Sequence, residues 1–168
     1  MKTNLSFFIS FVFSFILINS CDFISDLQEN SSKISFKAKA ISDKSGNTDT
    51  IVFTSKEIKC YNDSTHEIIF NDSVPLKTIS KYGRITCYLD ADSLFTATQT
   101  SDIMSFIVND LVLNHNLYDG KYYFDDGYPG WIDNVGATTL RAQNKAKRAD
   151  AWAKFIAQLK LEGKYKSN

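Results

Sequence analysis

The stretch LRAQNKAKRADAWAKFIAQLKLEG, residues 140–163, decides the expected fold. Its apolar residues recur at steps of three and four, which places them on one face of a helix, with lysines and other polar residues opposite. Thr139 is a candidate N-cap, and Gly163 is a candidate for the residue just past the last turn. The pattern predicts one amphipathic helix over about 140–162. Its apolar face consists of Ala149, Trp152, Ala153, Ile156 and Leu159.

Upstream of this helix, the chain carries short strand signals separated by turn signals. In residues 34–41, apolar and polar side chains alternate with a period of two, which suits a half-buried strand. Further β-branched or aromatic runs lie at 50–54, 67–70, 84–89 and 121–124, and the very apolar stretch 104–113 is predicted as a central strand. Strands first and a helix last predict an α+β fold: an antiparallel sheet with one C-terminal amphipathic helix packed on it.

The composition fits a single globular domain. The chain has 168 residues, 43% of them hydrophobic and 14% aromatic, which is enough apolar surface to offset the entropy of ordering a core. Its 19 basic residues equal its 19 acidic ones, so it is not a globally basic protein of the kind that binds nucleic acid.

The charge is nevertheless segregated along the chain. Residues 141–168 carry eight basic and two acidic side chains, whereas residues 21–140 carry 10 basic and 17 acidic ones. One interpretation is that a basic helix closes an acidic sheet, with Lys145, Lys147 and Arg148 near Asp125 and Asp126. The other is that the helix forms a surface for an anionic partner. The first is favoured, because charge runs on helices are usually solvated or locally paired.

The first 20 residues have the pattern of a signal peptide. Lys2 precedes a 14-residue apolar run, 5–18, broken only by three serines. As a helix this run is about 21 Å long, short of the roughly 30 Å hydrocarbon core of a bilayer. The sequence Ile18-Asn19-Ser20-Cys21 then resembles the lipobox of bacterial lipoprotein precursors. This resemblance implies cleavage before Cys21 and lipidation of its thiol.

The resemblance also implies how the chain is organised and where it is located. Residues 1–20 are a signal peptide, 21–33 a lipidated N-terminus and flexible tether, and 34–168 a single domain. Two or three acyl chains on one residue anchor a protein stably, whereas one chain does not. We expect an exported protein of the cell envelope, lipid-anchored to a membrane, with the outer membrane as the favoured one.

The mature chain is similar to small lipoproteins of Bacteroidota. The similarity rests on the segments Thr65-His-Glu-Ile-Ile-Phe, Asn109-Asp-Leu-Val-Leu and Asp126-Gly-Tyr-Pro and on the closing Trp152-x-x-Phe-Ile. Four segments also match the Asp-Ser/Thr pattern of O-glycosylation in that phylum. The resemblance implies glycan attachment at Thr50, Ser64, Ser73 and Ser93, although Asp-Ser and Asp-Thr are also common in turns.

Aromatic and acidic residues crowd the segment 118–131. Tyr128 and Trp131, with Asp125 and Asp126 beside them, form a candidate ligand or partner surface, because rings stack on sugars while acidic groups bind hydroxyls. The alternative is that many of these rings belong to the core, since successive side chains of a strand point to opposite faces.

No motif predicts a metal site, a cofactor or a catalytic residue. His66 and His115 are far apart, and Cys60 and Cys87 lack the C-x-x-C spacing of zinc sites. An exported compartment permits a disulfide between Cys60 and Cys87; the alternative is that Cys87 is a small buried apolar residue.

Together these observations predict a membrane-anchored envelope lipoprotein with a non-catalytic binding or structural role. One alternative is a small hydrolase acting on glycan or peptidoglycan, which would show clustered acids with shifted pKa values in a cleft. Another is an accessory subunit of an envelope protein complex, which would expose an apolar patch of roughly several hundred Å². The expected partners are the membrane, through the lipid on Cys21, and a glycan or an envelope protein, with no nucleic acid.

Overall fold

A computed structural model of the chain describes residues 35–41, 50–71, 79 and 83–167. The chain divides into two units, 1–34 and 35–168, and all described residues belong to the second. The predicted signal peptide, Cys21, the tether 21–33 and Ser73 lie outside the described residues, and the predictions on them stay predictions.

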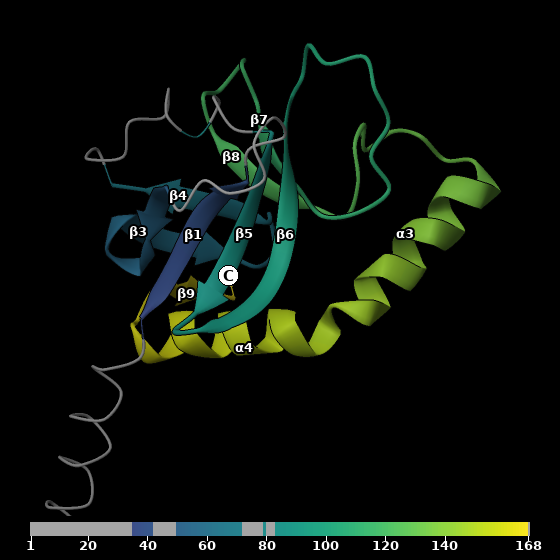
Figure 1. Cartoon of the computed structure of the whole chain (residues 1–168). Helices are drawn as coiled ribbons and strands as arrows, with labels where there is room; N and C mark the ends of the chain where they lie inside the picture. The colour runs from purple at the N-terminus through teal and green to yellow at the C-terminus, as the bar shows by residue number, and fades with distance from the viewer. Residues whose placement is uncertain (1–34, 42–49, 72–78, 80–82, 168) are drawn as a thin grey trace, which may run out of the picture. The chain divides into compact units, whose positions relative to one another are not determined.

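The described unit is built on a nine-stranded sheet that curves into a half-barrel (Figure 1). The order of the strands in the sheet is β2-β1-β5-β6-β7-β8-β4-β3-β9. A short 3-10 helix, η1 (Ser55–Glu57), joins β2 to β3. The strands are β1 (Phe36–Ile41), β2 (Ile51–Thr54), β3 (Ile58–Asn62), β4 (Glu67–Phe70), β5 (Arg84–Leu89), β6 (Asp92–Ser101), β7 (Val112–His115), β8 (Tyr122–Asp125) and β9 (Tyr165–Lys166).

The prediction of an antiparallel sheet with one helix is wrong. The sheet is mixed, because β6 runs parallel to β7 and β3 runs parallel to β9. Of the described residues, 40% lie in strands and 26% in helices. Parallel neighbours need a crossover connection rather than a hairpin, and residues 102–111 supply it as an irregular loop between β6 and β7. The apolar stretch 104–113, predicted as a strand, lies mostly in this loop, and only its last two residues enter β7.

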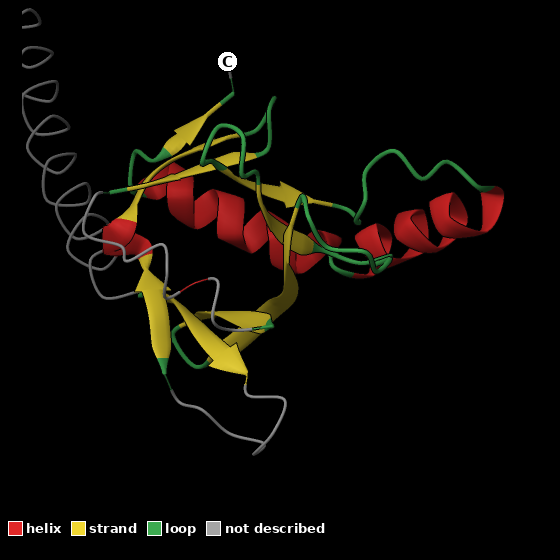
Figure 2. Ribbon diagram, turned by 90° about the horizontal axis from the view of Figure 1, so that it is seen from above, coloured by secondary structure: helices red, strands yellow, loops and turns green. Residues whose placement is uncertain are grey.

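The predicted single helix is two helices, α3 (Val135–Lys147) and α4 (Ala149–Leu161). Arg148 interrupts them, with backbone angles outside the helical range (φ −97°, ψ 4°). The N-cap of α3 is Asn134 rather than Thr139, because the Asn134 side chain accepts a hydrogen bond from the Ala137 backbone N at 2.8 Å. In Figure 2, α4 lies along the strands and α3 extends beyond them.

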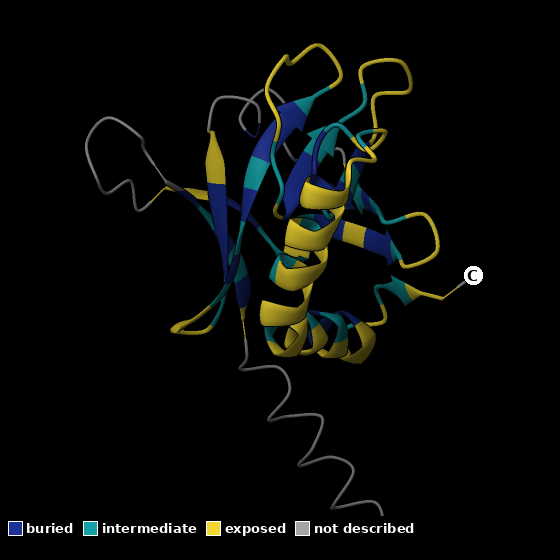
Figure 3. Ribbon diagram, turned by 90° about the vertical axis from the view of Figure 1, so that its right-hand side faces the viewer, coloured by how far each residue is buried: buried dark blue, intermediate teal, exposed yellow. Residues whose placement is uncertain are grey.

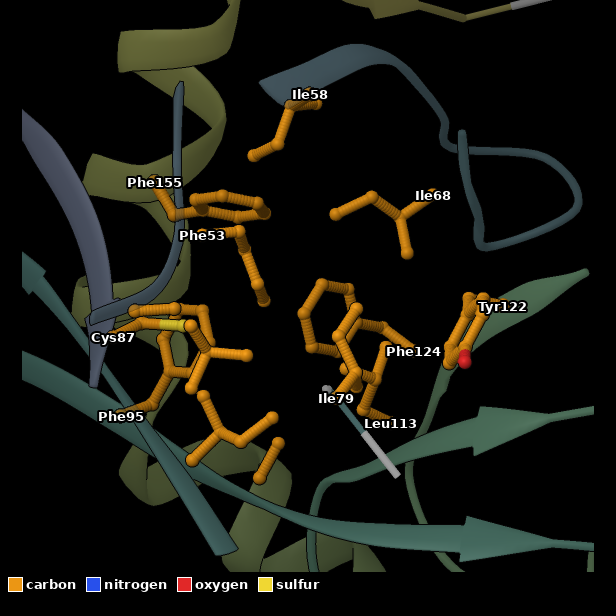
Figure 4. Close-up of a cluster of buried hydrophobic side chains, with 14 of the residues drawn as sticks. Phe53, Ile58, Ile68, Ile79, Cys87, Phe95, Leu113, Tyr122, Phe124 and Phe155 are labelled. Carbon is orange, nitrogen blue, oxygen red and sulfur yellow. The ribbon is translucent and has the colours of Figure 1, made fainter. Parts of the chain in front are cut away.

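Phe155 of α4 is the centre of an aromatic core. It is completely buried, and its ring centroid lies 5.1 Å from that of Phe36, 5.5 Å from Phe95 and 5.2 Å from Trp152. Figure 4 shows apolar side chains from the strands and α4 converging on this cluster. Each fully buried large side chain contributes about 1.5–3 kcal/mol to folding, so α4 is an integral part of the unit. By contrast, the one buried residue of α3 is Ala137.

Candidate functional site

A polar face at the end of α3 holds two loops of the sheet. The Arg141 guanidinium donates to Oδ1 of Asn109 at 3.3 Å and to the carbonyl oxygen of Pro129 at 3.0 Å. Asn144 donates through Nδ2 to the carbonyl oxygen of Asn109 at 2.8 Å. Steps of three and four residues place such side chains on one side of a helix. The face consists of Arg141, Asn144, Lys145 and Arg148.

Arg148, at the junction of the two helices, is the most buried cation of this face. Its side chain is 10% exposed and pairs with Asp110 at 2.9 Å and with Asp126. Lys145 pairs with the second oxygen of Asp126 at 2.7 Å. The expectation that the basic helix closes on acids of the sheet is confirmed for Lys145 and Arg148. These ion pairs hold the helix junction against Asp110, which lies just before β7, and Asp126, which lies just after β8.

Gly127 lets Arg141 lie directly on the backbone of the loop after β8. A Cβ atom at this position would stand 2.2 Å from Nε of Arg141, well inside van der Waals contact. The same loop contains the cis peptide bond Tyr128–Pro129, whose Pro129 carbonyl oxygen accepts from Arg141. The segment Asp126-Gly-Tyr-Pro, which carried part of the family resemblance, is therefore the loop on which α3 packs through Arg141.

A first cavity of about 390 Å³ opens beside this junction. Its floor is apolar and aromatic, and its rim carries charges of both signs. This combination is typical of ligand pockets, in which a few polar groups converge over an apolar floor. The floor is formed by Tyr61, Leu111, Phe124, Ala149, Trp152 and Ala153, and the rim by Asp63, His66, Asp126, Lys145 and Arg148.

A second cavity of about 320 Å³ shares Leu111 and Arg148 with the first. Its other lining residues are Arg84, Leu94, Phe95, Thr96, Thr98, Asp110, Asn144, Lys147 and Ala151. Arg148 thus stands between the two cavities. The second cavity is the more cationic, because it has three basic residues and a single acid.

Asp125 lies away from the cations that hold Asp126. Its Oδ1 is 3.9 Å from Nδ1 of His66, the residue that closes the turn between β3 and β4 with a left-handed φ of 59°. Burial raises the pKa of Asp125, and the nearby His66 opposes this effect in part. The two adjacent carboxylates therefore have different partners and different electrostatic environments.

Large apolar side chains are exposed on the loops after β6 and β7, which leave the same end of the sheet, and on the segment that leads from β8 into α3. We call this surface the apolar loop end. The exposed fraction is 80% for Ile103, 95% for Tyr118 and 82% for Trp131. Figure 3 shows these exposed loops beyond the ends of the strands. The residues are Ile103, Met104, Phe106 and Ile107 after β6, Leu117 and Tyr118 after β7, and Trp131 and Val135 at the start of α3.

Hydrogen bonds tie the three loops to one another. Asp102 accepts from the backbone N of Leu117 at 3.2 Å, which joins the first loop to the second. The backbones of Val108 and Tyr128 exchange two hydrogen bonds of 2.8 Å, which joins the first loop to the third. The Tyr128 hydroxyl donates to the carbonyl oxygen of Met104 at 3.0 Å. The apolar loop end is thus a cross-braced surface, and Tyr128 is its main brace.

The residues predicted as one ligand surface are therefore divided among three places. Tyr128 is buried, Trp131 is exposed on the apolar loop end, and Asp126 lines the first cavity. Asp125 lies beside His66. Sequence reasoning missed Arg84, Trp152 and the exposed residues 103–107. The apolar run itself was the signal for the last of these, but it is equally typical of a buried strand.

The cysteines and the described glycosylation candidates are also placed. Cys60 in β3 and Cys87 in β5 are free and buried, and burial raises the pKa of Cys87 well above its usual range. The disulfide that an exported compartment would permit between them is not formed in the structure, which agrees with the alternative that Cys87 is a small buried apolar residue. Thr50, Ser64 and Ser93 are exposed, as glycan attachment would require.

The described part of the chain shows no metal cluster and no membrane-spanning helix. Within residues 35–41, 50–71, 79 and 83–167, no three His, Cys, Asp or Glu side chains gather as a metal site would require. The helices of the same residues are too short or too polar to cross a membrane. The chain matches no family model, no curated protein and no solved structure.

Proposed function

We propose that this chain is an exported, lipid-anchored envelope protein with a non-catalytic role, and that it docks on another envelope protein through the apolar loop end. One observation carries the docking proposal. Of the eleven large hydrophobic residues that the described unit exposes, eight lie in the loops after β6 and β7 and in the segment from β8 into the start of α3, and hydrogen bonds tie these segments together. Scattered single residues of this kind are ordinary, but a gathering of them marks an interaction surface.

The cost of this surface supports a functional role. Apolar area left in water forgoes about 25 cal/mol per Å², and loops are ordinarily polar where they meet solvent. The cross-bracing through Asp102 and Tyr128 holds the apolar side chains outward instead of letting the loops collapse over them. A pre-organised apolar surface loses less conformational entropy when a partner binds.

A protein partner fits this surface better than the anchoring bilayer does. Phe36, at the start of β1, pairs with Leu89 at the end of the sheet where β6 begins, whereas two of the three apolar segments follow the ends of β6 and β7 (Figure 1). The ten residues of β6 span about 33 Å. Cys21 and Ser35 are 14 residues apart, at most about 50 Å of extended chain. To place the loops in the same bilayer, the tether would have to cover the length of β6, about two thirds of its maximum span.

The charges of the loops also favour a protein partner over the bilayer. Residues 102–107, 116–121 and 127–135 contain three aspartates and one lysine. An acidic rim repels anionic lipid headgroups, while it complements a protein whose apolar surface is bordered by lysine or arginine. We therefore expect a partner of that kind.

The hydrolase alternative has weaker support. Glycan hydrolysis uses two carboxyl groups in separate roles, one of them free to donate and accept a proton. Asp126, the acid at the centre of the first cavity rim, is held by Lys145 and Arg148. Asp125 has a raised pKa but lies with His66. This arrangement favours binding over acid–base chemistry.

Site-specific photocrosslinking in intact cells tests the docking. A photoreactive amino acid is placed at Phe106 or Trp131 in the full-length precursor, with Leu161, which is 68% exposed on α4, as the matched control. We expect a discrete protein adduct from the first two positions and none from the third. The variant Ile103→Ser should weaken the adduct at Trp131 without lowering the melting temperature. Adducts with lipid alone, or none at all, would contradict docking on a protein.

The anchor has a separate test. Cells fed a labelled fatty acid should incorporate it into the wild-type chain but not into a Cys21→Ser variant. Equal labelling of both would show that Cys21 carries no lipid.

A further inference from the structure

The two cavities at the helix junction are neighbours that share Leu111 and Arg148 in their linings, and they differ in chemistry. The first has an aromatic floor, and the second gathers cations. We infer that together they bind an anionic saccharide, with its sugar ring in the first cavity and its acidic group in the second. This site is independent of the apolar loop end, since the lining residues of the two cavities include none of the eight residues of that surface.

Two of the three basic side chains that line the second cavity have no partner among the described residues. Arg148 is already paired with Asp110 and Asp126. The side chains of Arg84 and Lys147, by contrast, have no ion pair or hydrogen bond with any residue that the structure describes. Two cations that line one cavity and have no partner among the described residues favour an anion there, because hydrogen bonds to charged groups are stronger than those between neutral groups.

Hydroxyl and amide groups complete the anion site. Arg84 in β5 stands directly opposite Thr98 in β6, and cross-strand partners of an antiparallel pair lie on the same face. Thr98 therefore brings its hydroxyl to the same side as the guanidinium. Asn144 lines the same cavity from α3. A carboxylate or a phosphate needs such a mixture of cations and neutral donors.

The first cavity suits the ring of a sugar. Trp152 lines it while its other contacts are with core rings, Phe124 at 5.5 Å and Tyr61 at 5.8 Å between centroids. This packing holds the indole rigid, and a rigid aromatic face is a platform for the apolar side of a sugar ring. Asp63 and His66 on the rim offer polar groups to the sugar hydroxyls. Both cavities lie in the range of about 300–1,000 Å³ that small-molecule sites occupy.

Carboxylate and phosphate sugars share this chemistry, and calorimetric titration separates them. The full mature chain is titrated with digalacturonate, with glucose 6-phosphate, with the neutral sugar maltose and with inorganic phosphate. We expect at least one acidic sugar to bind about tenfold more tightly than maltose and than phosphate alone. Equal affinity for acidic and neutral sugars would overturn the anion site. Equal affinity for phosphate and the sugar phosphate, with no binding of digalacturonate, would overturn the sugar site. Failure of both acidic sugars to bind would overturn the proposal.

The decisive variant is Arg84→Gln combined with Lys147→Gln. Neither side chain has a partner in the described unit, so the double variant should keep the melting temperature of the wild type. It should lose at least about tenfold in affinity for the acidic sugar and little for maltose. Lys154→Gln, an exposed lysine of α4 outside both cavities, is the matched control. Unchanged affinity of the double variant, or an equal loss in the control, would contradict the assignment.

Discussion

Asp125 and Asp126 show how one residue step changes the chemistry of a side chain. They follow each other at the end of β8, where successive side chains point to opposite sides. Asp126 meets Lys145 and Arg148, whereas Asp125 meets His66 and has its pKa raised by burial. The alternation itself is predictable from the sequence. The partners are not, because they arrive from about 20 residues downstream or about 60 upstream.

The first prediction is that Asp125→Asn stabilises the protein near neutral pH. Because the folded state binds this proton more tightly than the unfolded chain, stability falls as pH rises from about 4, the ordinary aspartate pKa, to the raised value. The amide does not titrate, so the variant should unfold with up to about 1 kcal/mol more free energy at pH 7 and no gain below about pH 4. Urea unfolding at both pH values measures this.

Asp126→Asn is the contrasting variant. It weakens the bonds to a buried guanidinium, so it should lower the free energy of unfolding by about 1–3 kcal/mol at pH 7. A stabilising effect of Asp126→Asn, or a destabilising effect of Asp125→Asn, would contradict the assigned environments.

At the scale of elements, the sequence predicts best where side-chain periodicity and burial coincide. The predicted apolar face lies within α4, and Leu159 of that face is completely buried. However, Ala149 and Ala153 are exposed, and the prediction left out Phe155, which is completely buried. The helical pattern continues upstream without a break, so it hides the interruption at Arg148. The interruption comes from tertiary pairing with Asp110 and Asp126, which no local propensity encodes. The run 104–107 fails for the opposite reason, since its apolar residues face solvent.

The second prediction concerns the α4 core. Phe155→Ala removes a completely buried ring that contacts five others and leaves a cavity, so the free energy of unfolding should fall by about 3–5 kcal/mol. Leu161→Ala, on an exposed position of the same helix, should change it by less than about 0.5 kcal/mol. Chemical denaturation of both variants measures the difference. Similar losses would mean that α4 is not held through this face.

The third prediction concerns the contact between Arg141 of α3 and the loop after β8. Gly127→Ala puts a methyl group on the Arg141 guanidinium and should displace it from Asn109 and Pro129, at a cost of about 1–3 kcal/mol. Arg141→Ala should cost a similar amount. The double variant should lose little more than either single one, since both remove the same contacts. Strictly additive losses in this cycle would show that the two residues act separately.

At the scale of the whole chain, the net charge of zero divides into an acidic sheet segment and a basic helical segment that meet at one junction. The order of charged residues along the sequence predicts that division. It does not predict the mixed sheet, because the parallel β6–β7 and β3–β9 pairings depend on tertiary structure and not on local sequence. Figure 3 shows the consequence for the helices: α3 is largely exposed, whereas α4 lies against buried strands. The two helices are therefore held to the same sheet by different forces, charge for α3 and apolar burial for α4.

The last prediction follows from this difference. The screening length of salt falls from about 10 Å at 0.1 M to about 3 Å at 1 M, which weakens the partly exposed pairs of Lys145 and Arg148 but not the packing of Phe155. Amide hydrogen exchange should therefore accelerate severalfold in α3 at about 1 M sodium chloride, while α4 changes less than about twofold. Mass spectrometry of peptides from 135–147 and 149–161 measures both helices in one experiment. Equal acceleration in the two would mean that they open together, and that the ion pairs at Asp126 do not set the stability of the junction.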